Sequence, residues 1–286
     1  MNKKPSPRAG VAGWPVAHSR SPMIHRHWLH KLKIAGSYER FAVPPGEFGP
    51  FADSIGRDGL IGTNVTAPHK EAAFAACERY TAVAKTLGAV NTLWREDGRL
   101  WGDNTDVEGF LSNMDESAPG WAAGGKTATV IGAGGAARAI VYALVFRRFE
   151  RIAIVNRTFQ RAETLAKQYG QGAVALPWDA LPSELAKSAL LVNTSSLGMA
   201  GQPPLSVDLS LLPADAVVAD IVYVPLRTKL VEAAYARGLR TAEGLGMLLH
   251  QAAPAFARWF GKRPAVTPAL RALVEDDIRA ARQENA

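Results

Sequence analysis

The chain has 286 residues, of which 48% are hydrophobic and 21% charged; this excludes an intrinsically disordered protein and leaves room for two domains of ordinary size. Its single cysteine excludes an internal disulfide and a thiolate metal cage and favours a cytoplasmic location, and no apolar run reaches the roughly 18–20 residues that cross a bilayer. The formal net charge of +7 comes from scattered Lys and Arg, so we expect small anionic ligands rather than nucleic acid.

The first predicted helix begins at Ser21-Pro22, because serine is a favoured N-cap and proline fits the first helical position. Ile24 and Trp28 then lie on one face of this helix. Ser19 has no such capping role, so it is a candidate binding hydroxyl beside Ser21. Of the three histidines in this helix only two share helical spacing and no acidic ligand is near, so we expect no metal site.

A predicted strand, Leu60–Thr66, leads into a helix that Pro68 opens, which places Lys70 in the first helical turn. The positive end of the helix dipole disfavours a cation there by a few tenths to about 1 kcal/mol. A lysine that breaks a local rule is a candidate acid–base group, and a lysine extended into solvent is the alternative. Asp106 precedes a later helix, where it could pair with an ammonium or act as an N-cap.

Further along, Val90–Leu93 and Leu100–Trp101 flank Asp97-Gly98, which predicts a hairpin with a type I′ turn. The polar stretch Ser112–Gly125 follows a short helix and is interpreted as a linker between two domains.

Two phosphate-binding patterns then follow each other closely. Gly120–Thr127 (GWAAGGKT) matches GxxxxGK[ST], and Gly132–Ala137 (GAGGAA) matches G-x-G-x-x-G/A. A P-loop must follow a strand and open a helix, whereas Lys126 leads into the predicted strand Ala128–Ile131. The second pattern follows that strand and precedes the predicted helix Ala136–Phe146. We therefore expect dinucleotide binding at Gly132–Ala137 and no nucleotide at the first pattern.

Strands and helices continue to alternate, which predicts α/β layers with a largely parallel sheet. The remaining predicted elements of this series are strands Ile152–Val155, Leu190–Asn193 and Val217–Ile221 and helices Arg161–Tyr169 and Lys229–Arg237. The last two helices, Leu245–Phe260 and Pro268–Arg282, have no strand between them, so we expect them to pack back onto the first domain.

The end of the second strand of this series indicates the cofactor. An NAD site usually places Asp or Glu there to bind the ribose 2′-hydroxyl. The chain instead has Asn156, Arg157 and Thr158, with Arg161 further on. A guanidinium suits phosphate oxygens, so the pattern favours the 2′-phosphate of NADP. The alternative is that this segment only turns the chain and caps the next helix.

Nine motifs occur in order along nearly the whole chain and together resemble the shikimate dehydrogenase family, NADP-dependent form. They are GWPVAHSRSP (13–22), NVTAPHK (64–70), GAVNT (88–92), NTD (104–106), GAGGAA (132–137), NRT (156–158), NTSSLGM (193–199), DIVYVP (220–225) and GLGM (244–247) with Gln251. Arg26, where many members carry Asn, and Ala82, where an acidic residue is frequent, depart from the family pattern.

The resemblance implies an oxidoreductase that reversibly reduces 3-dehydroshikimate to shikimate with NADPH, in chorismate and aromatic amino-acid biosynthesis. It implies that Lys70 is the acid–base residue and Asp106 its partner. The implied substrate residues are Ser19, Ser21, Thr66, Lys70, Asn91, Asp106, Tyr223 and Gln251. The implied cofactor residues are Gly132, Ala133, Gly134, Gly135, Ala136, Asn156, Arg157, Thr158, Arg161, Ile221, Gly244 and Met247, and no metal is needed.

The implied fold is α/β. An N-terminal substrate domain would comprise residues 1–105 and 245–286, and a Rossmann NADP domain with a doubly wound parallel sheet would comprise residues 106–244. Three alternatives stay open: a quinate/shikimate dehydrogenase, an amino-shikimate dehydrogenase, and a non-catalytic NADP-sensing regulator of the same fold. The oligomeric state, a homodimer included, is also open.

Overall fold

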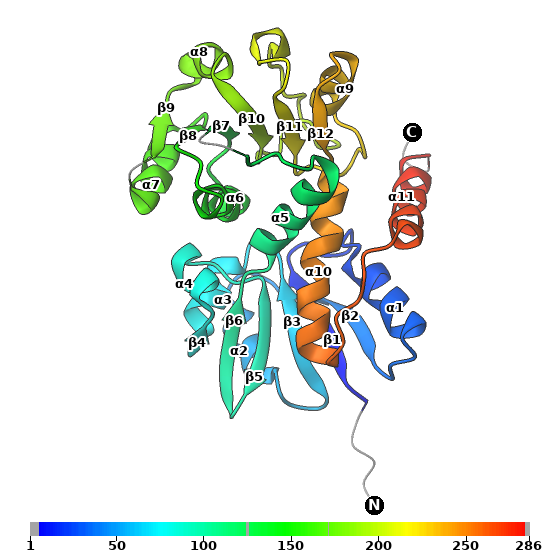
Figure 1. Cartoon of the computed structure of the whole chain (residues 1–286). Coiled ribbons are helices and arrows are strands. Elements are labelled where there is room, and N and C mark those ends of the chain that lie inside the picture. The colour runs from blue at the N-terminus through cyan, green and yellow to red at the C-terminus, as the bar shows by residue number, and fades with distance from the viewer. Residues whose placement is uncertain (1–5, 124–125, 171, 284–286) are drawn as a thin grey trace, which may run out of the picture. The chain divides into compact units, whose positions relative to one another are not determined.

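The computed structural model describes residues 6–123, 126–170 and 172–283, and these form two compact units (Figure 1). Unit 1 combines the described residues up to Thr105 with Gln251–Asp276. Unit 2 combines Asp106–His250 with the described residues from Asp277 onward. The return to unit 1, expected at Leu245, therefore begins at Gln251. Each unit contains its own six-stranded sheet.

The sheet of unit 1 is mixed and has the strand order β2-β1-β3-β5-β6-β4. Its strands are β1 (Arg8–Gly13), β2 (Ser37–Ala42), β3 (Leu60–Val65), β4 (Arg79–Tyr80), β5 (Thr92–Glu96) and β6 (Arg99–Asp103). Strands β1, β2 and β3 are parallel, whereas β5 is antiparallel to both β3 and β6. Asp97 and Gly98 have φ of 49° and 75° between β5 and β6, which confirms the predicted type I′ turn.

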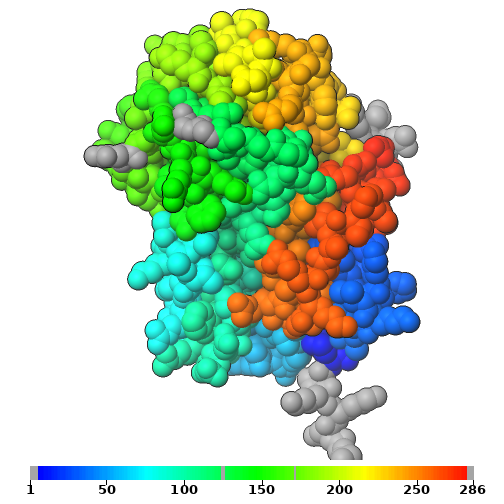
Figure 2. All heavy atoms as spheres, viewed as in Figure 1, coloured from blue at the N-terminus to red at the C-terminus, as the bar shows by residue number. Residues whose placement is uncertain are grey.

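Helices cover both faces of this sheet. The helices are α1 (Ser21–Lys31), α2 (Phe48–Ser54), α3 (Lys70–Ala76), α4 (Ala82–Leu87) and the part of α10 (Gly244–Phe260) from Gln251 onward. Trp259 and Phe260 of α10 pack on the face that carries Val11 and Tyr38. Orange atoms of α10 lie on the side of the molecule that Figure 2 shows. The opposite face packs against α2, α3 and α4 through Phe48, Ala73 and Ala84, among other buried side chains.

Unit 2 has a six-stranded parallel sheet in the order β12-β11-β10-β7-β8-β9. Its strands are β7 (Thr127–Ile131), β8 (Arg151–Val155), β9 (Ala173–Leu176), β10 (Ser188–Asn193), β11 (Val217–Asp220) and β12 (Arg240–Ala242). Counted from β7 as the first strand, this is the 3-2-1-4-5-6 order of the dinucleotide-binding Rossmann fold. The chain reverses direction across the sheet between β7 and β10, which is where such folds bind their ligands.

The helices of unit 2 lie in two layers (Figure 1), as right-handed crossovers between parallel strands require. They are α5 (Asp106–Ser117), α6 (Gly135–Phe146), α7 (Phe159–Tyr169), α8 (Leu181–Leu185) and α9 (Lys229–Ala236), while α11 (Pro268–Gln283) begins in unit 1 and ends in unit 2. Helices α8 and α9 bury Leu185 and Leu230 with Leu191 on one face. Within the described ranges, no helix has the length and hydropathy needed to cross a bilayer.

The linker prediction is wrong for its first half. Residues 112–117 belong to α5, because Val107, Phe110 and Met114 are buried at helical spacing, while the polar residues 115–117 face solvent. Asn113 is buried and donates from its amide to the Glu243 main-chain carbonyl, at 3.0 Å. Gly124 and Gly125, which end the predicted linker, lie outside the described residues.

Five helix starts differ from the prediction by one or two residues. Helices α6, α7 and α10 begin at Gly135, Phe159 and Gly244, earlier than predicted. The N-cap of α1 is Arg20, so Ser21 and Pro22 are already helical. Helix α3 begins at Lys70 itself, after a turn that contains Pro68. Several elements were not predicted: strands β1, β2, β4, β9 and β12 and helices α2, α4 and α8. The apolar runs of β9 and α8 are short and show no clear period.

Candidate active site

One edge of the sheet in unit 1 collects most of the predicted substrate residues. The parallel strands β1 and β3 end at this edge with Gly13 and Val65, and the antiparallel strand β5 begins there, since Asn64 pairs with Thr92. Strand β6 ends at the same edge, because Asp103 also pairs with Thr92. The segments that carry Ser19 and Ser21, Thr66 and Lys70, and Asn91 therefore follow or precede neighbouring strands.

Ser19 and Ser21 have different environments. Ser19 is half-buried, and its hydroxyl accepts a hydrogen bond from the main-chain N–H of Ser21, at 3.4 Å. The expectation that Ser21 caps α1 and that Ser19 has no capping role is thus wrong, because Ser19 supplies the acceptor at the helix start. Ser21 is buried.

Lys70 lies at the first position of α3 and is half-buried. The preceding residue, His69, is buried and donates from Nε2 to the Val43 carbonyl, at 2.7 Å. The Lys70 main-chain carbonyl accepts from the Val90 N–H at 3.0 Å, and the Thr66 N–H donates to the Ala12 carbonyl at 2.9 Å. These bonds fix the backbone that carries Thr66 and Lys70 against two neighbouring loops.

Asn91 is buried within a set of hydrogen bonds at the start of β5. Its Oδ1 accepts from the Thr105 N–H at 2.9 Å, from the Thr105 hydroxyl at 3.1 Å and from the Thr92 hydroxyl at 2.9 Å. The Thr105 hydroxyl also lies 3.5 Å from Oε1 of Gln251, on α10. Asn91 and Gln251, far apart in sequence, are therefore brought together through Thr105.

The two other predicted substrate residues belong to unit 2. Asp106 is the first residue of α5 and is buried, directly after Thr105 in the chain. Tyr223 is half-buried in the segment that follows β11. The predicted substrate residues thus divide between the units, with six in unit 1 and these two in unit 2.

In unit 2, the turn from β7 into α6 has the geometry that the glycine pattern predicts. Gly132 has φ of +113°, and a Cβ there would lie 2.5 Å from Oγ1 of Thr194, which follows β10. Gly134 is the N-cap of α6, and α6 begins at Gly135 without a side-chain cap. A Cβ on Gly134 or Gly135 would meet no atom within 4 Å, so the space beside the N–H groups of this helix start is open. Ala133 and Ala136 flank these glycines.

The end of β8 carries the predicted selectivity residues. Asn156 donates from Nδ2 to the main-chain carbonyl of Thr158, at 2.8 Å, and closes the turn. Thr158 is the N-cap of α7, but its side chain makes no capping bond. Arg157 and Arg161 are exposed. No carboxylate occurs between residues 156 and 161, so the only charges in this segment are positive and fit a phosphate.

The loops after β10, β11 and β12 follow the carboxyl ends of their strands, at the same edge of the parallel sheet as the turn after β7 and the end of β8. The Ile221 N–H donates to the Asn193 carbonyl at 3.1 Å. A Cβ on Gly244 would lie 2.5 Å from the carbonyl oxygens of Ile221 and Val222, so glycine permits the close approach of α10 to this loop. Met247 is buried one turn further along α10.

Sequence reasoning missed a buried carboxylate that joins two of these loops. Asp220 accepts from Nδ2 of Asn193 at 3.0 Å, from the Val222 N–H at 3.0 Å and from the Thr228 hydroxyl at 2.7 Å. Burial raises the pKa of Asp220 to about 6 despite these donors. Both Asp220 and Asn193 belong to motifs noted in the sequence, but only their long-range contact shows that Asp220 joins the two loops. Tyr38 and Asn64 of unit 1 were also missed, and Tyr38 stands in no motif.

The histidines of α1 belong to no candidate ligand group among the described residues. Within the described ranges, no group of three or more His, Cys, Asp or Glu side chains could hold a metal ion. His25 is fully buried and stacks on Tyr38, with ring centroids 4.0 Å apart and an interplanar angle of 9°. Burial lowers the pKa of His25 to about 3, so the ring is neutral.

The fold and the glycine turn define the class: a two-unit α/β protein with a Rossmann domain of the kind found in dinucleotide-dependent oxidoreductases. Three family models match the chain. They describe a shikimate dehydrogenase substrate binding domain (residues 11–93), a shikimate/quinate 5-dehydrogenase (residues 118–199) and a shikimate 5′-dehydrogenase C-terminal domain (residues 244–274).

Full-length relatives agree with these models. The shikimate dehydrogenase (NADP(+)) of Methylocella silvestris is 59% identical over 96% of this chain and 98% of its own length. The solved shikimate 5-dehydrogenase of Thermus thermophilus, in complex with NADP(H) and shikimate, is 36% identical with a TM-score of 0.82, over 96% of this chain and 99% of that one. The quinate dehydrogenase of Corynebacterium glutamicum, in complex with NAD, is 31% identical with a TM-score of 0.87, over 95% and 99%. The chain belongs to the shikimate dehydrogenase family.

Proposed function

We propose that this chain is an NADP-dependent shikimate dehydrogenase, which reversibly reduces 3-dehydroshikimate to shikimate in aromatic amino-acid biosynthesis. The structural observation that carries the proposal is the edge of unit 1, where Lys70 shares one sheet edge with the segments of Ser19, Ser21, Thr66 and Asn91. An amine surrounded by hydroxyl and amide groups suits a polyhydroxy acid, because a missing partner would leave polar groups unpaired. The identity of 59% to a named NADP(+) shikimate dehydrogenase supports it.

In the proposed mechanism, the Lys70 ammonium stabilises the negative charge that develops on the ketone oxygen and donates a proton to it. In the reverse direction the Lys70 amine accepts the proton of the shikimate hydroxyl. Asp106 is the proposed partner of the lysine and favours its protonated form between turnovers. The other proposed substrate residues bind the carboxylate and the remaining hydroxyls of the substrate. They are Ser19, Ser21, Thr66, Asn91, Tyr223 and Gln251.

The residues of unit 2 fit NADP. The open N–H groups at the start of α6, beside Gly134 and Gly135, form an anion site for a pyrophosphate. Arg157 and Arg161 would hold the 2′-phosphate, with Asn156 and Thr158 shaping the turn. Ile221, Gly244 and Met247 are the proposed contacts for the rest of the dinucleotide. When bound, NADPH supplies the hydride.

Each unit has a separate proposed role. Unit 1 is the proposed substrate domain, and unit 2 is the proposed NADP domain. The proposed partners of the chain are therefore small molecules. We also propose a cytoplasmic location, supported by a single, buried cysteine, Cys77, and a homodimer is the assembly to test by light scattering.

The test is NADP⁺ reduction by the purified protein with shikimate and quinate in parallel, and with NAD⁺ in place of NADP⁺. We expect shikimate with NADP⁺ to give the highest kcat/KM. Faster turnover of quinate would instead support a quinate/shikimate dehydrogenase. An inert protein that still binds NADPH would support a regulator of the same fold.

A further inference from the structure

Tyr38 is a fully buried tyrosine on the edge strand β2, and no substrate role has been assigned to it. Its hydroxyl donates to Oδ1 of Asn64 on β3, at 2.7 Å. The Asn64 amide donates from Nδ2 to the Asn91 main-chain carbonyl and to the Thr92 hydroxyl, both at 3.1 Å. Since a carbonyl can only accept, the amide orientation is fixed, and the Tyr38 proton must point to Asn64.

A proposed substrate residue, Asn91, stands at the end of this chain of bonds. The Thr92 hydroxyl donates to Oδ1 of Asn91, at 2.9 Å. The Thr105 donors on the same oxygen complete the set, so the Asn91 amide is held with Nδ2 directed away from them.

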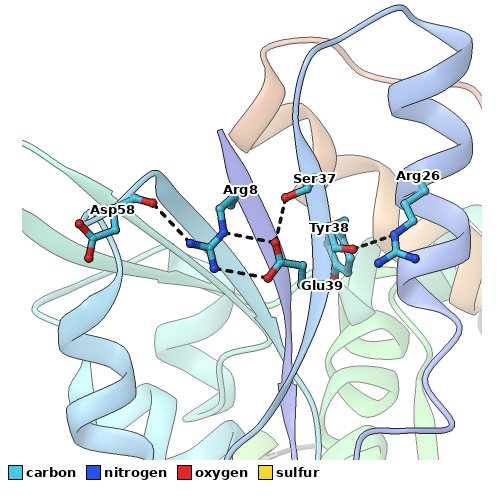
Figure 3. Close-up of polar contacts among 6 residues, drawn as sticks. All are labelled: Arg8, Arg26, Ser37, Tyr38, Glu39 and Asp58. Atoms are coloured by element: carbon cyan, nitrogen blue, oxygen red, sulfur yellow. Dashed lines mark hydrogen bonds and ion pairs between the residues drawn. The ribbon is translucent and has the colours of Figure 1, made fainter. Parts of the chain in front are cut away.

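The Tyr38 ring and backbone are also held. The ring stacks on His25, and it lies 6.1 Å from the ring of Trp259 on α10. Figure 3 shows Nε of Arg26 donating to the Tyr38 main-chain carbonyl, at 3.0 Å, on the strand edge that has no neighbour. The departure from the family pattern at Arg26 therefore has a structural role here.

The neighbouring residue of β2 is fixed as well. Arg8 makes a two-point pair with the Glu39 carboxylate, at 3.2 and 3.3 Å, and the Ser37 hydroxyl donates to Glu39 at 3.0 Å (Figure 3). These bonds hold β2 against β1, and the bond from Arg26 holds the Tyr38 main chain at the outer edge of β2. Tyr38 therefore has little freedom to move when its hydroxyl partners change.

We propose that Tyr38 is a positioning residue for shikimate binding, which orients Asn91 through Asn64 and Thr92. This inference rests on the proposed function. In this proposal Tyr38 acts through Asn91, a proposed substrate residue, and not by contact with the substrate. Its loss removes contacts made equally in the ground state and the transition state, so it affects substrate binding rather than the chemical step.

The experiment compares Tyr38→Phe with the wild type. We expect the KM for shikimate to rise about tenfold, the effect of losing roughly one net hydrogen bond, with kcat changed by less than about threefold. The KM for NADP⁺ stays unchanged, because the proposed cofactor residues lie in unit 2. Tyr80→Phe is the matched control: it removes a hydroxyl from the same unit that bonds only the main-chain carbonyls of Phe74 and Cys77.

A second pair of variants keeps the test valid if Tyr38→Phe folds poorly. Thr92→Val removes the hydroxyl that links Asn64 to Asn91, and it should raise the KM for shikimate like Tyr38→Phe. Thr92→Ser keeps that hydroxyl and should restore the wild-type KM. Tyr38 and Thr92 act through one network of hydrogen bonds. The loss of shikimate binding free energy in the double variant should therefore be smaller than the sum of the losses in the two single variants.

The outcomes separate the two proposals. A wild type that oxidises neither shikimate nor quinate overturns the proposed function and this inference with it. An active wild type whose KM for shikimate is unchanged in Tyr38→Phe and in Thr92→Val overturns the inference alone. Equal KM increases in Tyr38→Phe and Tyr80→Phe would also overturn it, since the effect would then reflect general loss of a hydroxyl.

Discussion

At the scale of single residues, Lys70 carries the proposed chemistry. Replacing it with alanine removes the group that donates and accepts the proton, so Lys70→Ala should lower kcat by about 100-fold or more. The affinity for NADPH should change little, because the proposed cofactor residues lie elsewhere. Steady-state kinetics with shikimate and a fluorescence titration with NADPH measure both quantities.

The control is Lys85→Ala, which removes an exposed lysine of α4 in the same unit and should leave kcat as in the wild type. If Lys70→Ala retained the wild-type kcat, the lysine would be a solvated side chain and the acid–base group would have to be sought at another residue.

Arg157 is the residue that we expect to select NADP over NAD. A hydrogen bond to a charged group contributes about 1.5–3 kcal/mol, which corresponds to roughly a ten- to hundredfold change in affinity. Arg157→Ala should therefore weaken NADP⁺ by about that factor and leave NAD⁺ nearly unchanged, since NAD⁺ has no 2′-phosphate. The measurement is the KM for each cofactor at saturating shikimate.

Arg161→Ala and the double variant show how far the two guanidinium groups share the phosphate. Equal weakening of NADP⁺ and NAD⁺ in Arg157→Ala would contradict the assignment and leave Arg157 with a structural role only.

At the scale of elements, two glycines of the turn between β7 and α6 have different roles. Gly132 has a positive φ and lies against Thr194, whereas Gly134 has φ of −92° and faces open space. Gly132→Ala should therefore lower the Tm of the protein, because the backbone is strained and a Cβ would clash with Thr194. Gly134→Ala should leave the Tm unchanged and weaken NADPH binding, since only a bound pyrophosphate would meet its Cβ.

Thermal unfolding and NADPH titration of both variants test this difference. A Gly134→Ala variant that binds NADPH like the wild type would mean that the pyrophosphate does not approach this position.

At the scale of the whole molecule, two buried ionisable groups give the two units opposite responses to pH. Asp220 in unit 2 has a folded pKa of about 6, above the ordinary value of 3.8, so folding favours its protonated form. Its contribution to stability is present below about pH 4 and is lost as pH rises to 6. His25 in unit 1 has a pKa of about 3, below the ordinary 6.5, so its contribution is present above pH 6.5 and is lost as pH falls.

Asp220→Asn tests the first of these effects. The amide mimics the protonated carboxyl, so the variant should be more stable than the wild type at pH 7, by up to about 3 kcal/mol at 1.36 kcal/mol per pKa unit. The difference should shrink between pH 6 and 4 and vanish below. Denaturant unfolding of both proteins across this range measures it. A variant equally destabilised at pH 4 and pH 7 would show that the bonds to Asn193 and Thr228 matter more than the buried charge.

The glycine turn, the hairpin at Asp97-Gly98 and the Rossmann alternation were predictable, because each depends on residues close together in the chain. The length of α5 was not, because its polar surface residues resemble a linker until the buried face of Val107, Phe110 and Met114 is seen. Ser19 was likewise misjudged, since its hydroxyl accepts from the Ser21 N–H in a geometry that the sequence does not display.

Local backbone preference, periodicity and motif order can be read along the chain, so they predicted the dinucleotide turn, the alternation of strands and helices around it and the family. Which distant side chains share a hydrogen bond follows only from the fold. Tyr38 meets Asn64 across the β2-β1-β3 sheet, and Asp220 meets Asn193 across β10 and β11. Such pairs follow from strand order and register, which are set by the packing of the whole sheet rather than by the residues beside each partner.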